Sequence, residues 1–254
     1  MLELKGITKI YNRGTVTEMT LFDGFDLTVP DGQFVSIVGS NGSGKTSLLN
    51  ILSGTVSIDG GQILSDGVDI QKKKEFRRYE TMGRVYQDPA LGTCPSLTVL
   101  ENLSLADNKG KRFGLGRGVD RRRVAEYRDQ LASLGLGLED KLDVPMGALS
   151  GGQRQTIALL MATLTPLRLL LLDEHTAALD PKTAETIMAL TGKLVAEKKL
   201  TALMVTHNLR YALEYGDRLL MLSHGQSVLD RAGEEKRQTS TEELLDLFNR
   251  ISVL

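Results

Sequence analysis

From residue 34 the chain reads Phe34-Val-Ser-Ile-Val-Gly-Ser-Asn-Gly-Ser-Gly-Lys-Thr46, and this stretch decides the fold. The apolar run 34–38 predicts a buried central strand, and the pattern over residues 45–52 predicts a helix. A glycine-rich turn that ends in Lys-Thr between a strand and a helix is the pattern of a phosphate-binding loop. We expect Lys45 to neutralise nucleotide phosphates and the Thr46 hydroxyl to hold Mg²⁺. The predicted nucleotide contacts are Gly39, Ser40, Asn41, Gly42, Ser43, Gly44, Lys45, Thr46 and Ser47.

Two carboxylates follow a second apolar run. Residues 169–172 are all leucine, and Asp173-Glu174 comes directly after them. Open α/β sheets bind their ligands at the carboxyl ends of strands. Acidic residues often simply end strands, but next to a phosphate loop they predict catalysis. We expect Asp173 to hold Mg²⁺ through water and Glu174 to polarise the water that attacks the γ-phosphate of ATP.

A second glycine-rich turn, Leu149-Ser-Gly-Gly-Gln-Arg-Gln155, opens another predicted helix. The N-terminus of a helix is an anion-binding site. One nucleotide cannot easily contact both turns of the same chain, so a partner chain is implied. The residues of this turn expected to meet nucleotide are Ser150, Gly151, Gly152 and Gln153.

The remaining pattern is that of an α/β protein with appended parts. Residues 202–205 are predicted to form another buried strand followed by a helix. Residues 2–10 and 21–29 alternate and predict edge strands. Between about residues 98 and 147 the pattern becomes helical and polar, beginning with a capping box at Thr98 and Glu101. Asp180-Pro181 predicts the start of a helix that runs toward Lys199, and Ser240 is expected to cap a short amphipathic helix.

Composition excludes several classes of protein. The chain has 254 residues with 31 basic and 32 acidic side chains, so no large positive field indicates a nucleic-acid partner. The single cysteine, Cys94, rules out an internal disulfide and suits a reducing compartment; we expect it to be a small buried residue. The N-terminus lacks a secretory pattern. Residues 156–172 are apolar but contain Pro166 and Arg168, so they predict a buried helix, a turn and a buried strand rather than a membrane span.

In order and over nearly the whole chain, these motifs resemble the ATP-binding cassette (ABC) ATPases. The resemblance implies a P-loop NTPase core of the α/β class with an antiparallel β subdomain, formed by residues 1–97 and 148–254, and an inserted α-helical subdomain at 98–147. It implies that Ser150, Gly151 and Gly152 close over the γ-phosphate held by a partner subunit. Further roles come from the same resemblance.

Four more positions match the family's functional residues. Gln87 matches the glutamine that senses Mg²⁺ and water and relays the nucleotide state to the helical lobe. His207 matches the switch histidine that contacts the γ-phosphate, although a histidine at a strand end is more often structural. Asp180 matches the loop that couples two sites across the dimer, and helix capping alone would also explain it. Tyr11 stands where family members stack an aromatic ring on adenine; a packing role is the alternative.

Two segments depart from the family's pattern or stay open. His175 replaces the usual proline and is either a polar contact or filler; with Asp173, Glu174 and Asp180 intact, we do not expect lost hydrolysis. The run 156–164 lacks an arginine common in the family, and with residues 173–181 it is similar to a bacterial branch of predicted amino-acid uptake systems. The basic segment 109–123 is predicted to be a solvated face in preference to a lipid-headgroup or permease contact.

The expected function is ATP hydrolysis, with ATP and Mg²⁺ as cofactors, on behalf of a bacterial membrane transporter. We expect a homodimer of ATPase subunits at the cytoplasmic face of the membrane, with transmembrane permease subunits and a solute-binding protein as partners. Import of a small solute is favoured. A soluble cassette protein acting on DNA or ribosomes is the first rival, but such proteins resemble paired cassettes or carry coiled-coil insertions. The second rival is an exporter or lipoprotein-release ATPase, which shares every nucleotide-binding residue.

Overall fold

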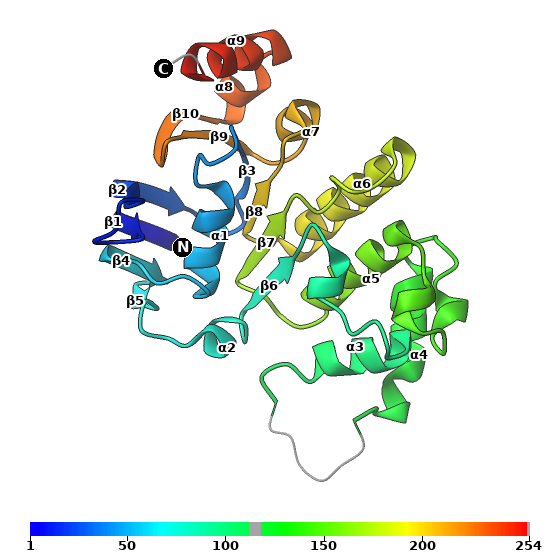
Figure 1. The fold of residues 1–254 in the computed structure, drawn as a ribbon. Coiled ribbons are helices and arrows are strands. Elements are labelled where there is room, and N and C mark those ends of the chain that lie inside the picture. Colours follow the sequence, from blue (N-terminus) through cyan, green and yellow to red (C-terminus); the bar gives the residue numbers. More distant parts are fainter. Residues whose placement is uncertain (112–117, 253–254) are drawn as a thin grey trace.

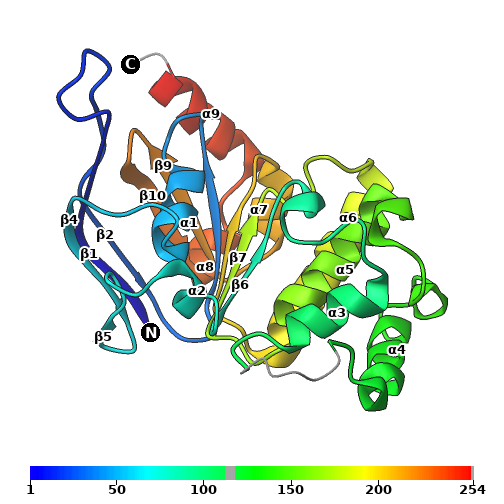
Figure 2. The same ribbon diagram turned by 60° about the horizontal axis from the view of Figure 1, so that its bottom comes forward.

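Two β-sheets organise the chain, and helix α1 (Lys45–Ser53) packs between them (Figures 1 and 2). The computed structural model describes residues 1–111 and 118–252. Four apolar residues of α1 belong to the core cluster that joins the two sheets: Leu48, Leu49, Ile51 and Leu52. The helix that the phosphate loop opens is therefore anchored on both sides.

The larger sheet has six strands in the order β10-β9-β3-β8-β7-β6. All neighbouring pairs are parallel except β10 with β9. The run predicted from the phosphate-loop stretch is β3, an interior strand as expected. The bounds are β3 Phe34–Gly39, β6 Met82–Val85, β7 Leu169–Asp173, β8 Ala202–Val205, β9 Arg218–Ser223 and β10 Gln226–Ala232.

Both faces of this sheet are covered, which explains the unbroken apolar runs of its strands. In β7, Leu169 and Leu171 belong to the core under α1, while Leu170 and Leu172 belong to the core on the opposite face. That opposite face is covered by α5 (Gly151–Thr163), α6 (Pro181–Lys198) and α7 (Leu209–Glu214). The helix, turn and strand predicted over residues 156–172 are confirmed. No helix in the described ranges 1–111 and 118–252 is long and apolar enough to cross a bilayer.

The smaller sheet is antiparallel, as predicted, with the order β2-β1-β4-β5. Its strands are β1 Leu2–Tyr11, β2 Met19–Val29, β4 Gly60–Ser65 and β5 Val68–Asp69. The prediction of two edge strands was wrong for β1, which pairs on both sides, and right for β2. An interior strand of an antiparallel sheet still alternates when one face of the sheet is exposed to solvent, so alternation does not identify an edge.

The helical part contains α3 (Val99–Asp107) and α4 (Val124–Ala132) and lies beside α5, away from the smaller sheet (Figure 2). The capping box at Thr98 and Glu101 is present. These helices share a core cluster with Leu149, Ile157 and Leu160, so α5 contributes apolar side chains to two cores. The limits 98–147 for a helical subdomain stay a prediction.

Shorter elements complete the chain. Helices α2 (Glu75–Arg78), α8 (Gly233–Arg237) and α9 (Thr241–Ser252) flank the sheets, and Ser240 accepts a hydrogen bond from the Glu243 backbone as its predicted capping role requires. Single turns of 3₁₀ helix lie at Pro89–Leu91, Arg121–Arg123, Glu139–Lys141 and Met146–Ala148. Cys94 is exposed, which contradicts the expected burial. It lies on the loop before α3, where its backbone exchanges hydrogen bonds with the Asn102 amide.

The turn between β9 and β10 gives a stability prediction. Gly225 has φ +72°, and a Cβ atom there would collide with the Leu21 carbonyl of β2. Its NH also donates to the Ser43 carbonyl of the phosphate loop at 3.1 Å. We expect Gly225→Ala to cost about 3 kcal/mol, since an unfavourable backbone conformation adds to overpacking. The free energy of unfolding, measured in urea, checks this value.

The matched control is Gly233→Ala. Gly233 also has positive φ, +56°, but nothing lies within 4 Å of the position of its Cβ. Only the conformational term applies, about 1 kcal/mol. Equal losses of stability in the two variants would show that the β9–β10 turn does not approach β2 closely.

Candidate active site

The phosphate loop leaves β3 at Gly39 and reaches α1 at Gly44, which has φ +106° and caps the helix. The Lys45 ammonium folds back over the loop and donates to the carbonyls of Gly39 and Ser40 at 2.8 and 2.9 Å. Burial lowers the pKa of Lys45, while the negative charges of Glu174 and Asp173 act to raise it. The loop thus holds one cation beside its free backbone NH groups, an arrangement that suits phosphate.

Thr46 and Asp173 meet across two elements, as the sequence predicts. The Thr46 hydroxyl donates to Asp173 Oδ1 at 3.3 Å. The other carboxylate oxygen, Oδ2, accepts from Arg84 Nη2 at 2.7 Å, in an ion pair whose side chains are 4% and 11% exposed. The Asp173 carboxylate is therefore held with one oxygen toward Thr46 and the other toward β6.

Glu174 and His207 meet beyond the ends of neighbouring strands β7 and β8. His207 Nε2 lies 2.6 Å from Glu174 Oε1. Glu174 adopts φ +48°, and its NH donates to the Val205 carbonyl at 2.9 Å. Left-handed backbone at a residue other than glycine is unusual and often marks a functional site. The Glu174 side chain is mostly buried while that of His207 is half exposed, so the pair faces solvent from its histidine side.

A cleft of about 490 Å³ joins the phosphate loop to the end of β1. Tyr11 forms one wall, and its hydroxyl lies 3.3 Å from Ser47 Oγ. The predicted site residues that line this cleft are Tyr11, Asn41, Gly42, Gly44, Lys45, Thr46, Ser47 and Glu174. An aromatic ring, a phosphate loop and a carboxylate thus share one opening, which has room for a nucleotide.

The second glycine-rich turn does not line that cleft. Ser150 caps α5 in a capping box, with Gln153 NH donating to Ser150 Oγ at 3.3 Å and Gln153 Oε1 accepting from Ser150 NH at 3.2 Å. A Cβ on Gly152 would collide with Thr183 of α6, so glycine allows α5 and α6 to approach closely. The turn is exposed at Ser150. Its geometry suits contact with a nucleotide held by another molecule.

Asp180 and Gln87 occupy exposed positions. Asp180 caps α6 by accepting from Thr183 NH at 3.1 Å, and hydrogen bonds from Thr183 lower the pKa of its carboxyl. Gln87 follows β6 by two residues on an exposed loop. That loop is tied to α5 where Gln155 Nε2 donates to the Tyr86 carbonyl at 2.9 Å. Capping therefore accounts for Asp180 locally, and among the described residues Gln87 forms no hydrogen bond with Thr46 or Asp173.

The oxygen donors fit a magnesium ion. Mg²⁺ prefers hard oxygen ligands and is usually bound by one or two carboxylates together with substrate phosphates. Asp173 Oδ1 and the Thr46 hydroxyl supply such donors beside the phosphate loop. Within residues 1–111 and 118–252, no three His, Cys, Asp or Glu side chains form a metal cage. A site completed by nucleotide phosphates is the arrangement these residues can make.

Arg84 was not foreseen from sequence. It lies in the buried strand β6, where an arginine is unusual unless its charge is paired. Beside its contact with Asp173, Arg84 Nη1 donates to Asn50 Oδ1 of α1 at 2.8 Å. The signal was present as a charged residue inside an apolar strand, but its partner is distant in sequence.

His175 is a polar contact in the core. Its side chain is fully enclosed, and Nε2 lies 3.1 Å from the Thr191 hydroxyl of α6. That hydroxyl already donates to the Ile187 carbonyl at 2.7 Å, so the ring must donate Nε2–H to it. Burial lowers the pKa of His175 to about 4, and the ring is neutral at pH 7.

Several side chains of the basic segment have partners in its described part. Lys109 Nζ donates to the Met82 carbonyl of β6 at 2.9 Å, and burial lowers its pKa to about 8. Arg123 pairs with Asp107 and Glu126, and Lys111 pairs with Asp107. Lys109 is therefore not the freely solvated charge that the sequence predicted. Residues 112–117 of the segment lie outside the described residues.

Comparisons with known proteins agree with this geometry. The family model described as "ABC transporter" matches residues 22–177. The tyrosine transport ATP-binding protein of Clostridioides difficile is 48% identical over 248 residues, which cover 98% of each chain. The lipoprotein-releasing system ATP-binding protein LolD of Roseobacter denitrificans is 34% identical, over 89% of this chain and 96% of LolD.

A solved structure has the same fold. The dimeric, post-hydrolysis ATP-binding cassette MJ0796, bound to ADP and Pi, superposes with a TM-score of 0.75 at 31% identity. The match covers 91% of this chain and 98% of that one.

His175 gives a prediction for the pH dependence of stability. Its pKa is depressed in the folded state, so the unfolded chain binds a proton below pH 6.5 while the folded chain resists it down to about pH 4. Stability must fall as the pH drops through this window. Between pH 7 and pH 5 we expect His175 to contribute a loss of about 2 kcal/mol.

The measurement compares unfolding in urea for the wild-type chain and His175→Gln at both pH values. All other titrating groups are common to the two proteins, so the difference between their losses isolates His175. An equal loss in both proteins would mean that the ring is not kept neutral by burial.

Proposed function

Because this chain belongs to the ABC transporter ATPase family, we propose that it hydrolyses ATP as a pair of identical subunits and powers uptake of an amino acid through a membrane permease. The observation that carries the proposal is the Glu174–His207 pair at 2.6 Å, next to the cleft lined by Lys45 and Thr46. A carboxylate held by an imidazole beside a phosphate loop is suited to activating water for attack on a phosphoryl group.

In this proposal, the chain's own residues position the nucleotide and the attacking water. Backbone NH groups of residues 39–46 and the Lys45 ammonium bind the phosphates, and Tyr11 stacks on the adenine. Glu174 orients the attacking water and accepts its proton, while His207 holds Glu174 and contacts the γ-phosphate. Thr46, Asp173 and Gln87 would hold Mg²⁺, which when bound neutralises charge on the β- and γ-phosphates.

The paired arrangement is supported by the exposed second turn. Ser150, Gly151, Gly152 and Gln153 would cover the γ-phosphate held by the partner subunit, and Asp180 would couple the two sites. Closure of the pair would then require two nucleotides, each bound between a phosphate loop and the opposing α5. The MJ0796 cassette, whose solved form is dimeric and bound to ADP and Pi, supports this arrangement.

The nature of the cargo rests on similarity. The relative from Clostridioides difficile is named for tyrosine transport and is 48% identical along 98% of both chains. This agrees with the resemblance to amino-acid uptake systems. The similarity to LolD, at 34%, supports a second candidate function, lipoprotein release. A permease and a solute-binding protein are the proposed partners in uptake, and the cytoplasmic face of a bacterial membrane is the proposed location.

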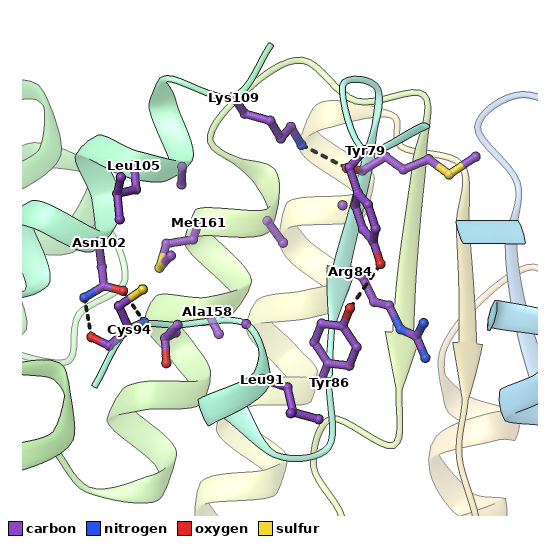
Figure 3. Close-up of a pocket in the computed structure, with 16 residues that line it drawn as sticks. Tyr79, Arg84, Tyr86, Leu91, Cys94, Asn102, Leu105, Lys109, Ala158 and Met161 are labelled. Carbon is purple, nitrogen blue, oxygen red and sulfur yellow. Dashed lines mark hydrogen bonds between the residues drawn. The ribbon is translucent and has the colours of Figure 1, made fainter. Parts of the chain in front are cut away.

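The proposed permease contact is the helical lobe near Gln87. Between the loop after β6 and helices α3 and α5 lies a groove of about 460 Å³ (Figure 3). Two large apolar side chains at this groove are exposed, Leu91 and Leu105. Exposed apolar groups around a hollow are typical of a protein contact.

Glu174→Gln tests the catalytic assignment. The amide keeps the size of the side chain but cannot accept the proton, so we expect turnover to fall by about 100-fold or more while ATP binding persists. The variant should accumulate as a closed dimer with ATP and Mg²⁺. Steady-state ATPase assays, nucleotide binding and size-exclusion chromatography measure these three properties.

Glu185→Gln is the control for that variant, because Glu185 is an exposed carboxylate on α6 that pairs with Arg210 of α7. It should hydrolyse ATP at the wild-type rate. Vigorous hydrolysis by Glu174→Gln would remove Glu174 from the catalytic role.

A pull-down tests the transporter proposal. Tagged Glu174→Gln, loaded with ATP and Mg²⁺, is recovered from native membranes, and the proteins that accompany it are identified. We expect a polytopic permease and a solute-binding protein that binds an amino acid. A permease with lipoprotein but no amino-acid receptor would favour lipoprotein release, and recovery of ribosomes, DNA or only a self-dimer would contradict both transport functions.

A further inference from the structure

The groove beside the Gln87 loop is connected to the Asp173 carboxylate by direct side-chain contacts. Tyr79 and Tyr86 form its wall next to β6, and their hydroxyl groups lie 3.1 Å apart. Figure 3 shows these hydroxyls facing one another and the Arg84 guanidinium extending away from Leu105 and Met161. Tyr86 and Arg84 are two residues apart in sequence, so they project to the same side of the extended chain.

The Tyr86 ring covers the Arg84 guanidinium. Arg84 Cζ lies 4.6 Å from the ring centroid, within the range of a cation–π interaction. Tyr86 immediately precedes Gln87, and its carbonyl accepts from Gln155 of α5. The ring that holds Arg84 therefore belongs to the segment that joins the core to the helical part.

Hydrogen bonds to α1 and β7 fix the orientation of the Arg84 guanidinium. Its two terminal nitrogens donate to Asp173 Oδ2, Asn50 Oδ1 and Ser53 Oγ, at 2.7, 2.8 and 3.5 Å. Its Nε is buried without a hydrogen-bond partner in the part of the chain that the structure describes. A buried guanidinium with one unsatisfied donor is costly, so its retention calls for a benefit other than stability.

We propose that Arg84 is a positioning residue for the metal ligand Asp173: it holds Oδ2 so that Oδ1 points to Thr46, and Tyr86 holds Arg84 in place from the groove. This inference rests on the proposed Mg²⁺-ATP chemistry and goes beyond it, because it assigns two residues that do not touch the nucleotide. The groove is thereby linked to the proposed metal site: Tyr86 contacts Arg84, Arg84 contacts Asp173, and Asp173 contacts Thr46.

The sign of the effect follows from burial. Without Arg84 the Asp173 carboxylate would be a buried charge without its main partner, and it would be free to rotate. Rotation withdraws Oδ1 from the position opposite Thr46. Loss of a residue that orients a metal ligand typically weakens metal binding 10- to 100-fold. The repulsion between Arg84 and a metal ion acts in the opposite direction, so the experiment decides between orientation and charge.

The test measures how binding of a fluorescent ATP analogue to the purified chain depends on Mg²⁺ concentration, in the Glu174→Gln background so that nothing is hydrolysed. In Arg84→Met we expect the Mg²⁺ concentration for half-maximal effect to rise about 10-fold, while binding without metal is unchanged. Arg84→Lys, which keeps the charge, should recover part of the loss. Mn²⁺ titrated by electron paramagnetic resonance gives the same quantity directly.

Variants of Tyr86 test the same role of Arg84 if Arg84→Met does not fold. Tyr86→Leu removes the ring over Arg84 and should raise the half-maximal Mg²⁺ concentration several-fold, whereas Tyr86→Phe keeps the ring and should not. In a double-mutant cycle, Tyr86→Leu should add nothing to Arg84→Met, because both act through one contact. The matched control is Arg231→Met, which breaks an arginine–carboxylate pair with Glu243 on α9.

The outcomes separate this inference from the proposed function. A chain that binds no ATP analogue at all would contradict the proposed function. Normal analogue binding with an unchanged or lowered Mg²⁺ requirement in Arg84→Met would overturn the role of Arg84 and leave the proposed function standing. An effect of equal size in Arg231→Met would likewise overturn it, since the loss would then reflect general destabilisation.

Discussion

The register of three neighbouring parallel strands is the constraint on which the site depends. Val205 of β8 pairs with Asp173 of β7 on one side and with Ile37 of β3 on the other. All three strands run in the same direction, so the phosphate loop, the two carboxylates and His207 leave the sheet at one edge. A shift of one residue in any pairing would separate Lys45, Glu174 and His207. The apolar runs that bury both faces of the sheet are therefore also what aligns the polar site.

Much of this arrangement was predictable because the relevant signals are local. A strand buried on both faces gives an unbroken apolar run, and the polar residues directly after it lie at the strand end. Thr98, Asp180 and Ser240 were likewise identified as helix caps, and their partners lie three residues away. That the second glycine-rich turn meets a nucleotide on a partner chain was expected from its place at a helix N-terminus, and the family resemblance added that Ser150, Gly151 and Gly152 close over the γ-phosphate.

The errors and omissions concern relations that a single sequence does not encode. β1 alternates like an edge strand, yet pairs on both sides because the exposed face of its sheet produces the same alternation. Cys94 was expected to be buried on the general behaviour of cysteine, but it lies on a surface loop. Arg84 was overlooked because its partners, Asn50 and Asp173, are 34 and 89 residues away in the chain. Spacing carries no information about such contacts.

Helix α5 contacts both the larger sheet and the helical part of the molecule. Ser150 caps this helix, and Gly152 lies in its first turn. Gln155 of the same helix donates to the Tyr86 carbonyl. Apolar side chains of α5 pack in both the sheet core and the helical core. Because packed interfaces resist deformation, we expect a displacement of α5 to move the exposed turn at its start and to act on Tyr86 through the Gln155 hydrogen bond. Tyr86 covers Arg84, and Arg84 holds Asp173. Helix α5 thus links the surface proposed to meet a partner subunit to the groove proposed to meet a permease, and through Tyr86 and Arg84 to the carboxylate proposed to hold the metal.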